Sequence, residues 1–173
     1  PTEGALVVAA AREGLDKNKL EEEQPRRADL PFDSNRKLMS TVHPRAEDGF
    51  RVYVKGAPDI LLNRCTSGPR GPLTAPQRTK ILRANEEMAG QALRVLAVAQ
   101  RDLAFLPPTL DSQTLENGLT FLGLFGLMDP PRPEAKEAVA LCHRAGVRPV
   151  MITGDHKATA AAVARELGIL PPG

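Results

Sequence analysis

The sequence predicts an α+β fold in which helices flank an antiparallel sheet, followed by a shorter α/β segment. Two observations carry this prediction. Up to residue 128, strand-like segments follow one another, with helices and loops between some of them, and show no regular helix–strand alternation. Beyond the proline-rich residues 129–133, the sequence predicts a helix, a strand and a second helix, the alternating order that is typical of an α/β fold.

Length and composition exclude several functional classes. With 173 residues, the chain can bury one good core, or one domain and part of another. A formal net charge of +2 is too small to indicate a nucleic-acid partner. No run of roughly 18 apolar residues occurs, so we expect no segment that spans a membrane. We also expect this fragment to make no direct contact with a membrane. The two cysteines and three histidines are scattered, which disfavours a zinc site and predicts reduced thiols.

The first predicted element is a helix with Glu3 in its first turn, of which residues 5–13 are rich in alanine and valine. Thr2 is a suitable N-cap, and Gly14 stands where such a helix would end. Residues 16–24 are acidic and polar, and we expect them to be solvated.

A β-hairpin should follow this polar stretch. Residues 30–42 predict one bent strand or two short ones, because Pro31 cannot donate a ladder hydrogen bond. Residues 50–54 alternate between apolar and polar side chains. We expect them to pair with residues 37–42 across a turn at 44–49.

The remainder of the first part mixes helices, strands and loops. Pro58 suits the first position of a helix, and Thr74 suits the cap of a longer one. The predicted elements are a short helix at 58–62, a loop at 66–72, a long helix at 74–91, a strand at 93–99, a surface connection at 103–117 and a strand at 119–128. The last strand would be buried on both faces if its glycines are packing sites.

The proline-rich segment predicts a domain boundary, because stiff prolines suit a hinge better than a helix or a strand. We therefore predict a first domain at 1–127, a hinge at 128–133 and a second, partial domain at 134–173. After the prolines we expect a helix at 133–145, a strand at 147–152 and a helix at 157–167.

The turn after the predicted strand at 147–152 could bind an anion. Met151-Ile-Thr-Gly-Asp155 leaves a strand and enters a helix, where backbone N–H groups and the helix dipole favour negative charge. Thr153 adds a hydroxyl donor, and Gly154 would let a phosphate approach the backbone. Taken alone, such a segment is more often a capped turn without a ligand.

Phe32 is the candidate platform for a flat base. The chain has only six aromatic residues, and stacking of a base on such a ring contributes about 1–3 kcal/mol. Phe32 stands between Pro31 and polar residues, an unusual place for a core phenylalanine. The residues alone leave two possibilities open, a stacking platform or a core side chain at a strand end.

Three segments, read in order, resemble the cytoplasmic head of P-type cation-transporting ATPases. They are Phe32-Asp-Ser-Asn-Arg-Lys-Leu-Met-Ser40, Lys55-Gly-Ala-Pro-Asp59 and Met151-Ile-Thr-Gly-Asp155. Two more, Pro1-Thr-Glu-Gly-Ala-Leu6 and Asp129-Pro-Pro-Arg132, fit the branch that includes calcium and sodium/potassium pumps. The resemblance implies a nucleotide-binding domain whose first part lies upstream of this chain. Part of a haloacid-dehalogenase-like phosphorylation domain would follow it.

The resemblance also implies roles for residues on the adenine side. Phe32 would stack on the adenine ring, and Glu3 would accept a hydrogen bond from its amino group. Lys55 would lie at the bottom of the adenine pocket, with Gly56 against the ring.

Further roles concern the rest of the nucleotide. By the same resemblance, Lys37 would lie near the nucleotide and Arg94 would meet the ATP phosphates. Arg36 would then face solvent or a surface carboxylate, since neighbours on a strand point to opposite sides. The implied phosphate-side residues are Thr153, Gly154 and Asp155.

The nucleophile of the family is absent from this sequence. The segment Asp-Lys-Thr-Gly-Thr, whose aspartate takes the γ-phosphate, does not occur, and neither does a Gly-x-x-x-x-Gly-Lys loop. Asp129 follows an apolar strand, but Pro-Pro-Arg-Pro comes after it, so we assign Asp129, Pro130, Pro131 and Arg132 to the hinge. We therefore expect weak binding of ATP or ADP without hydrolysis, and no catalytic residue or metal ligand in this chain.

The resemblance implies a parent protein in a membrane, with this chain on its cytoplasmic face. The parent would be an ATP hydrolase and ion translocase that uses Mg²⁺ and forms an aspartyl-phosphate. Its partners would be ATP or ADP and the pump's own phosphorylation, actuator and transmembrane domains, with no nucleic acid. Two alternatives stay open: a non-catalytic nucleotide-binding or interaction module, and a fragment of a haloacid-dehalogenase-like phosphatase.

Overall fold

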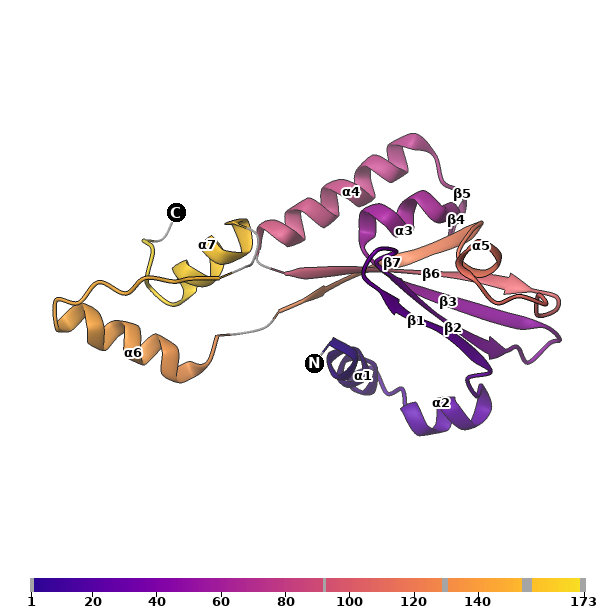
Figure 1. Ribbon diagram of the computed structural model, residues 1–173, viewed down its shortest axis with the longest axis horizontal. Coiled ribbons are helices and arrows are strands. Elements are labelled where there is room, and N and C mark those ends of the chain that lie inside the picture. Colours follow the sequence, from indigo (N-terminus) through magenta and orange to yellow (C-terminus); the bar gives the residue numbers. More distant parts are fainter. Residues whose placement is uncertain (1, 92, 129–130, 154–156, 172–173) are drawn as a thin grey trace. The chain divides into compact units, whose positions relative to one another are not determined.

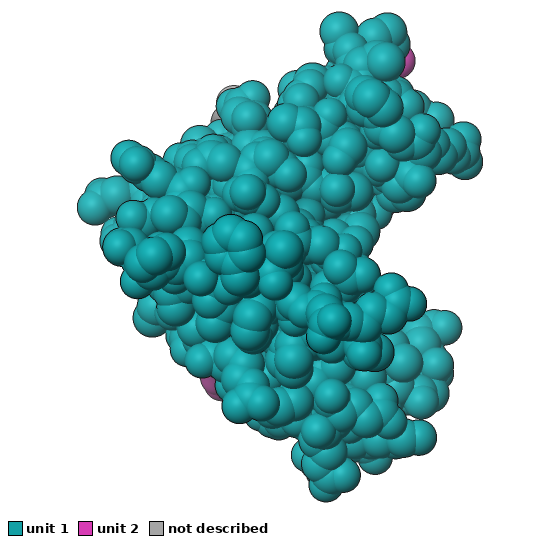
Figure 2. Space-filling model, turned by 90° about the vertical axis from the view of Figure 1, so that its right-hand side faces the viewer, with its two compact units in different colours: residues 1–82, 96–125 teal, residues 83–95, 126–173 magenta. Residues whose placement is uncertain are grey.

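Seven strands form one sheet in the order β1-β2-β3-β6-β7-β4-β5 (Figure 1). The computed structural model describes residues 2–91, 93–128, 131–153 and 157–171. The strands are β1 (Ala28–Asp33), β2 (Leu38–Pro44), β3 (Phe50–Gly56), β4 (Cys65–Gly68), β5 (Gly71–Pro72), β6 (Arg94–Leu103) and β7 (Leu119–Leu127). The chain divides into two compact units. The first unit holds residues 1–82 and 96–125, and the second unit holds residues 83–95 and 126–173 (teal and magenta in Figure 2).

The predicted hairpin is confirmed. β2 and β3 run antiparallel, with Leu38 opposite Gly56 and Met39 opposite Lys55. The segment before the hairpin forms two strands, because β1 is a separate strand that pairs antiparallel with β2. β6 adds to β3, again antiparallel. One pair, β4 with β7, is parallel, and the sequence did not predict it.

The core of the first unit lies on one face of this sheet. Val42 of β2 and Val52 and Val54 of β3 are fully buried, because alternate residues of a strand point to the same face. α3 (Pro58–Arg64) packs on these residues through Leu61. Burial of each such side chain contributes about 1.5–3 kcal/mol.

Two helices lie on the side of the sheet away from α3, namely α1 (Thr2–Arg12) and α2 (Lys17–Glu23) (Figure 1). α1 confirms the predicted first helix. Residues 17–23, expected only as a solvated segment, form α2 because Asp16 caps it, accepting a hydrogen bond from the N–H of Asn18 at 2.8 Å. No residue of α2 is buried, so the expected solvation is confirmed.

The prediction that residues 103–117 form a surface connection is wrong for the second half of this segment. It contains α5 (Ser112–Leu115), whose N-cap Asp111 forms a reciprocal capping box with Thr114. Leu115 and Glu116 are fully buried. The helical turn capped by Asp111 therefore places the side chains of Leu115 and Glu116 in the core, whereas a polar surface loop would leave its side chains exposed.

Three further predicted helices are confirmed as α4 (Ala75–Gly90), α6 (Pro133–Arg144) and α7 (Lys157–Glu166). Both α3 and α6 begin with proline at the first helical turn, where the missing N–H is not needed. Within the residues that the structure describes, no helix has both the length and the apolar character needed to cross a membrane.

The strand predicted at 147–152 is wrong, because these residues form no strand. A strand needs a neighbour that pairs its backbone groups. Val150 and Ile152 are 77% and 94% exposed, so this apolar segment is not covered either. The likeness of this part to a haloacid-dehalogenase-like domain stays a prediction, as do the predicted domain boundaries.

Candidate functional site

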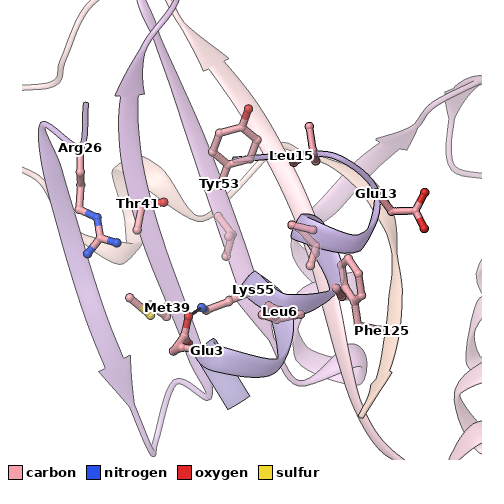
Figure 3. A pocket seen from close by; sticks show the side chains of 14 residues that line it. Glu3, Leu6, Glu13, Leu15, Arg26, Met39, Thr41, Tyr53, Lys55 and Phe125 are labelled. Carbon is pink, nitrogen blue, oxygen red and sulfur yellow. Dashed lines mark hydrogen bonds and ion pairs between the residues drawn. The ribbon is translucent and has the colours of Figure 1, made fainter. Parts of the chain in front are cut away.

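A cavity of about 790 Å³ lies in the first unit, between α1 and the sheet face opposite the core (Figure 3). Its volume is in the range of small-molecule sites. Glu3, Leu6, Ala9, Ala10, Glu13 and Leu15 line it from α1 and the turn after α1. The strands of the sheet contribute Met39, Thr41, Tyr53, Val54, Lys55, Val98 and Phe125, and the segment before β1 contributes Arg26. The walls are therefore mainly apolar, with a few charged and hydroxyl groups.

The strand alternation explains which side chains reach this cavity. Met39 lies opposite Lys55, and Thr41 lies opposite Tyr53, in the β2–β3 ladder. Residues paired in this way share one face of a sheet. Val98 of β6 continues the row beside Lys55. All five side chains therefore line the cavity below α1 rather than the core.

Two predicted nucleotide-binding residues, Glu3 and Lys55, meet in the cavity. The Lys55 ammonium donates a hydrogen bond to Glu3 Oε2, and Figure 3 shows the two side chains pointing toward one another beside Met39. The Lys55 side chain is 24% exposed and the Glu3 side chain 67%. An ion pair with this much exposure contributes at most about 1 kcal/mol to folding stability. A ligand can therefore separate the two side chains. The pair offers a ligand one carboxylate acceptor and one ammonium donor.

The turn after β1 brings the first predicted motif to the end of β3. The carboxylate of Asp33 accepts hydrogen bonds from the N–H groups of Asn35 at 3.0 Å and Arg36 at 2.7 Å. Lys37 then adopts a left-handed backbone with φ of +54°. Its carbonyl oxygen lies against Gly56, the residue after Lys55. The two motifs therefore adjoin, and the structure gives Gly56 a packing role, while its contact with a ring stays a prediction.

Phe32 lies on β1 and is not one of the residues that line the cavity. It is 63% exposed, which excludes the alternative of a core side chain at a strand end. An exposed aromatic ring next to the Asp33–Lys37 turn is available to a planar group from solvent. Its stacking on adenine stays a prediction.

The prediction for Arg36 is wrong. Its side chain is only 20% exposed, and its Nε lies 2.9 Å from Oε2 of Glu116, whose side chain is fully buried. Residues 36 and 37 belong to a turn, so the alternation of a strand does not apply to them. Glu116 also accepts hydrogen bonds from Ser40 and Ser112. The sequence analysis did not identify Glu116 as a buried partner of Arg36. Its position directly after an apolar residue was the one feature of the sequence that could have indicated burial.

The remaining predicted residues belong to the second unit or lie outside the described residues. Arg94 begins β6 and is exposed, and Thr153 is exposed as well. Arg132 precedes α6 in an extended conformation. Pro131, also described, stands just before it and is half-buried. The predicted residues outside the described part are Asp129, Pro130, Gly154 and Asp155. The phosphate-side and hinge roles therefore stay predictions.

Mg²⁺, which the family resemblance implies, needs several oxygen ligands in a near-octahedral arrangement. Across residues 2–91, 93–128, 131–153 and 157–171, no group of three or more acidic, histidine or cysteine side chains could hold a metal ion. These residues do not form a Mg²⁺ site by themselves. We assign no chemical step of this chain to that ion.

Residues 1–134 match the family model described as P-type ATPase, cytoplasmic domain N. The chain is 44% identical over 175 residues to Cation-transporting ATPase pma1 of Synechocystis sp.. It is 46% identical over 173 residues to Calcium-transporting ATPase 1 of Bacillus cereus, and 42% over 174 residues to Sodium/potassium exporting P-type ATPase cta3 of Schizosaccharomyces pombe.

These alignments cover nearly all of the chain and a small part of each relative. They span 100%, 98% and 99% of this chain, but 19%, 19% and 17% of the three relatives. The chain thus corresponds to less than one fifth of their length. With a matching family model over most of its residues and relatives of this identity, the chain belongs to the P-type cation-transporting ATPase family.

Proposed function

We propose that this chain is the nucleotide-binding part of an ATP-driven cation pump, and that the cavity below α1 receives the adenine end of ATP or ADP. The observation that carries the proposal is the meeting of Glu3 and Lys55 in that cavity, next to the contact between Lys37 and Gly56. The family's name for the matched region, cytoplasmic domain N, supports a role inside a larger ATPase.

The charged pair suits the edge of adenine. The exocyclic amino group of adenine is a donor, and the Glu3 carboxylate can accept from it. The ring nitrogens of adenine are acceptors, and the Lys55 ammonium can donate to one of them. Guanine would present a carbonyl oxygen where adenine has its amino group, and a carboxylate cannot donate to it. Met39 and Val98 supply apolar contact for one face of the ring.

Residues outside the cavity would extend the site. Phe32, exposed beside the turn, would cover the second face of the base, and stacking of this kind contributes about 1–3 kcal/mol. Lys37 and Arg94, both exposed cations, would meet the more polar parts of the nucleotide. In the intact pump, Thr153, Gly154 and Asp155 would serve the phosphate end.

This chain would bind nucleotide without hydrolysing it. Its sequence contains no Asp-Lys-Thr-Gly-Thr segment, so the aspartate that accepts the γ-phosphate would come from elsewhere in the parent. When bound in the parent, Mg²⁺ would neutralise phosphate charge during that transfer. The chain's own residues would hold the base and exclude water from it. Its partners would be the other domains of the same pump, at the cytoplasmic face of the membrane.

A nucleotide titration tests the proposal. With contacts to base and ribose alone, we expect a dissociation constant nearer 1 mM than 1 μM, that is about −4 rather than −8 kcal/mol. ATP and ADP should both bind, and GTP more weakly, in NMR shift titrations. Free phosphate should not accumulate. Absence of ATP binding, or steady release of phosphate as from a phosphatase, contradicts the proposal.

A further inference from the structure

We propose that Glu116 is a positioning residue for nucleotide binding. Through Arg36 it holds the turn between β1 and β2 in the one conformation that presents Phe32 and Lys37 to the nucleotide. This inference rests on the proposed function, because it concerns the shape of the same binding site. Glu116 itself is buried and would not touch the nucleotide.

Three side chains donate hydrogen bonds to the Glu116 carboxylate. Its side chain is fully buried, and both oxygens accept hydrogen bonds. Arg36 Nε lies 3.1 Å from Oε1 and 2.9 Å from Oε2. The hydroxyl of Ser40 donates to Oε1, and the hydroxyl of Ser112 donates to Oε2 at 2.7 Å. The carboxylate is thus fixed from β2 and from α5 at the same time.

Arg36 also binds two backbone carbonyl oxygens through Nη2. Nη2 donates to the carbonyl oxygen of Pro31 at 2.8 Å and to that of Leu38 at 3.2 Å. Pro31 is the residue before Phe32, and Leu38 is the residue after Lys37. One guanidinium therefore ties together the two ends of the segment that carries both predicted nucleotide contacts. A planar fork of donors can do this, whereas a lysine ammonium cannot match the same geometry.

The backbone of Lys37 adopts an unusual conformation. Its φ of +54° is sparsely populated for a residue with a side chain. Such a conformation costs about 1–3 kcal/mol and persists only when its surroundings impose it. The pair of Arg36 and the buried Glu116 contributes to that constraint. A buried ion pair is a weak source of net stability, because desolvation opposes the attraction. A role in fixing one conformation of the turn therefore explains the ion pair of Arg36 and Glu116 better than a contribution to folding stability does.

The test uses Glu116→Gln, which keeps the shape of the side chain and removes its charge. We expect ATP affinity to fall about fivefold, a coupling typical of residues in one network. The loss should be selective in NMR spectra. The Phe32 ring and the Lys37 amide should lose most of their ATP-induced shifts, while Lys55 should still respond. In the absence of ATP, the ¹³Cα shift and backbone coupling of Lys37 should move away from left-handed values.

A second variant covers the case in which Glu116→Gln does not fold. Arg36→Lys keeps the positive charge beside Glu116 but cannot reach both carbonyl oxygens, so we expect the same selective loss. The matched control is Asp102→Asn, which makes the same carboxylate-to-amide change opposite another arginine, Arg51. It lies outside the proposed site and should leave ATP affinity within about twofold, as distant sites usually do.

The outcomes separate the two proposals. If the unchanged chain binds ATP but both variants bind it equally well, the positioning role is wrong and the proposed function stands. A uniform loss of ATP-induced shifts at Phe32, Lys37 and Lys55 also overturns the positioning role, since it indicates general destabilisation. If the unchanged chain does not bind ATP, both proposals fail.

Discussion

The carbonyl oxygen of Lys37 lies so close to the Cα of Gly56 that a Cβ atom at residue 56 would stand 2.1 Å from it. This contact joins the turn after β1 to the end of β3, and the Ala57 N–H donates to the same carbonyl at 3.1 Å. The segments around Lys37 and Gly56, which are separated along the chain, thus meet at this one carbonyl oxygen.

Gly56→Ala should therefore destabilise the first unit. The added methyl group meets backbone, which cannot move aside as a flexible side chain would, so we expect a loss of about 1–3 kcal/mol. Urea denaturation measures it. The matched control is Gly90→Ala at the end of α4, where nothing lies within 4 Å of an added Cβ. That variant should be neutral or slightly stabilising. Equal stability of the two variants would mean that the Lys37 contact is looser than described.

Phe32→Ala should weaken ATP binding by about 1–3 kcal/mol if the ring stacks on the base. The melting temperature should change little, because Phe32 is 63% exposed. Phe105 provides the control, since it is 75% exposed in the same unit and does not line the cavity. Its replacement by alanine should leave ATP binding unaltered. An unaffected ATP affinity in Phe32→Ala would rule out stacking on this ring.

Lys55 should be protected by ATP from an amine-reactive reagent. Its side chain lines the cavity and is 24% exposed, so a bound base would cover the remaining surface. Lys80, exposed on α4, should react equally with and without nucleotide. Peptide mass spectrometry after brief labelling compares the two sites. If ATP left the labelling of Lys55 unchanged, the base would have to bind elsewhere.

The pair of Arg51 and Asp102 should make stability depend on pH in the acid range. Arg51 donates hydrogen bonds to the Asp102 carboxylate at 2.7 and 2.9 Å and so lowers the pKa of Asp102 below its ordinary value of 3.8. A carboxyl with a lowered folded pKa stabilises the fold above its unfolded pKa, and this contribution is lost as pH falls through the folded value.

We therefore expect the stability of the unchanged chain to fall more steeply below about pH 4 than that of Asp102→Asn. The effect should be modest, because the Asp102 side chain is 38% exposed and solvent screens the pair. Melting temperatures measured from neutral to acid pH test this. Parallel curves for the two proteins would show that the pair contributes no pH dependence.

Amides of residues 150–152 should exchange with solvent faster than those of β2 and β7. These residues form no strand, and Ile152 is 94% exposed, whereas β2 is paired on both sides. Hydrogen exchange followed by NMR resolves the segments. Strong protection of residues 150–152 in a dilute sample would contradict their description as unpaired.

Several features could be predicted from the sequence because they depend on neighbouring residues. The hairpin of β2 and β3 follows from alternation and an intervening turn, and α3 follows from Pro58 at its start. Glu3 and Lys55 were predicted as site residues from the family resemblance rather than from a local pattern, and the structure brings them together. Their motifs pointed to the family, and comparison of the whole chain confirmed it.

Other features depend on groups that are far apart in the sequence. Arg36 pairs with Glu116, 80 residues away, and no local pattern in a turn indicates which buried acceptor will lie beside it. The burial of Leu115 and Glu116 likewise depends on α5 being packed against the sheet. Local propensity set the helices and the hairpin, because their hydrogen bonds join near neighbours. The long-range contacts decided the rest, since a buried charge needs a partner and a strand at 147–152 needs a neighbouring strand.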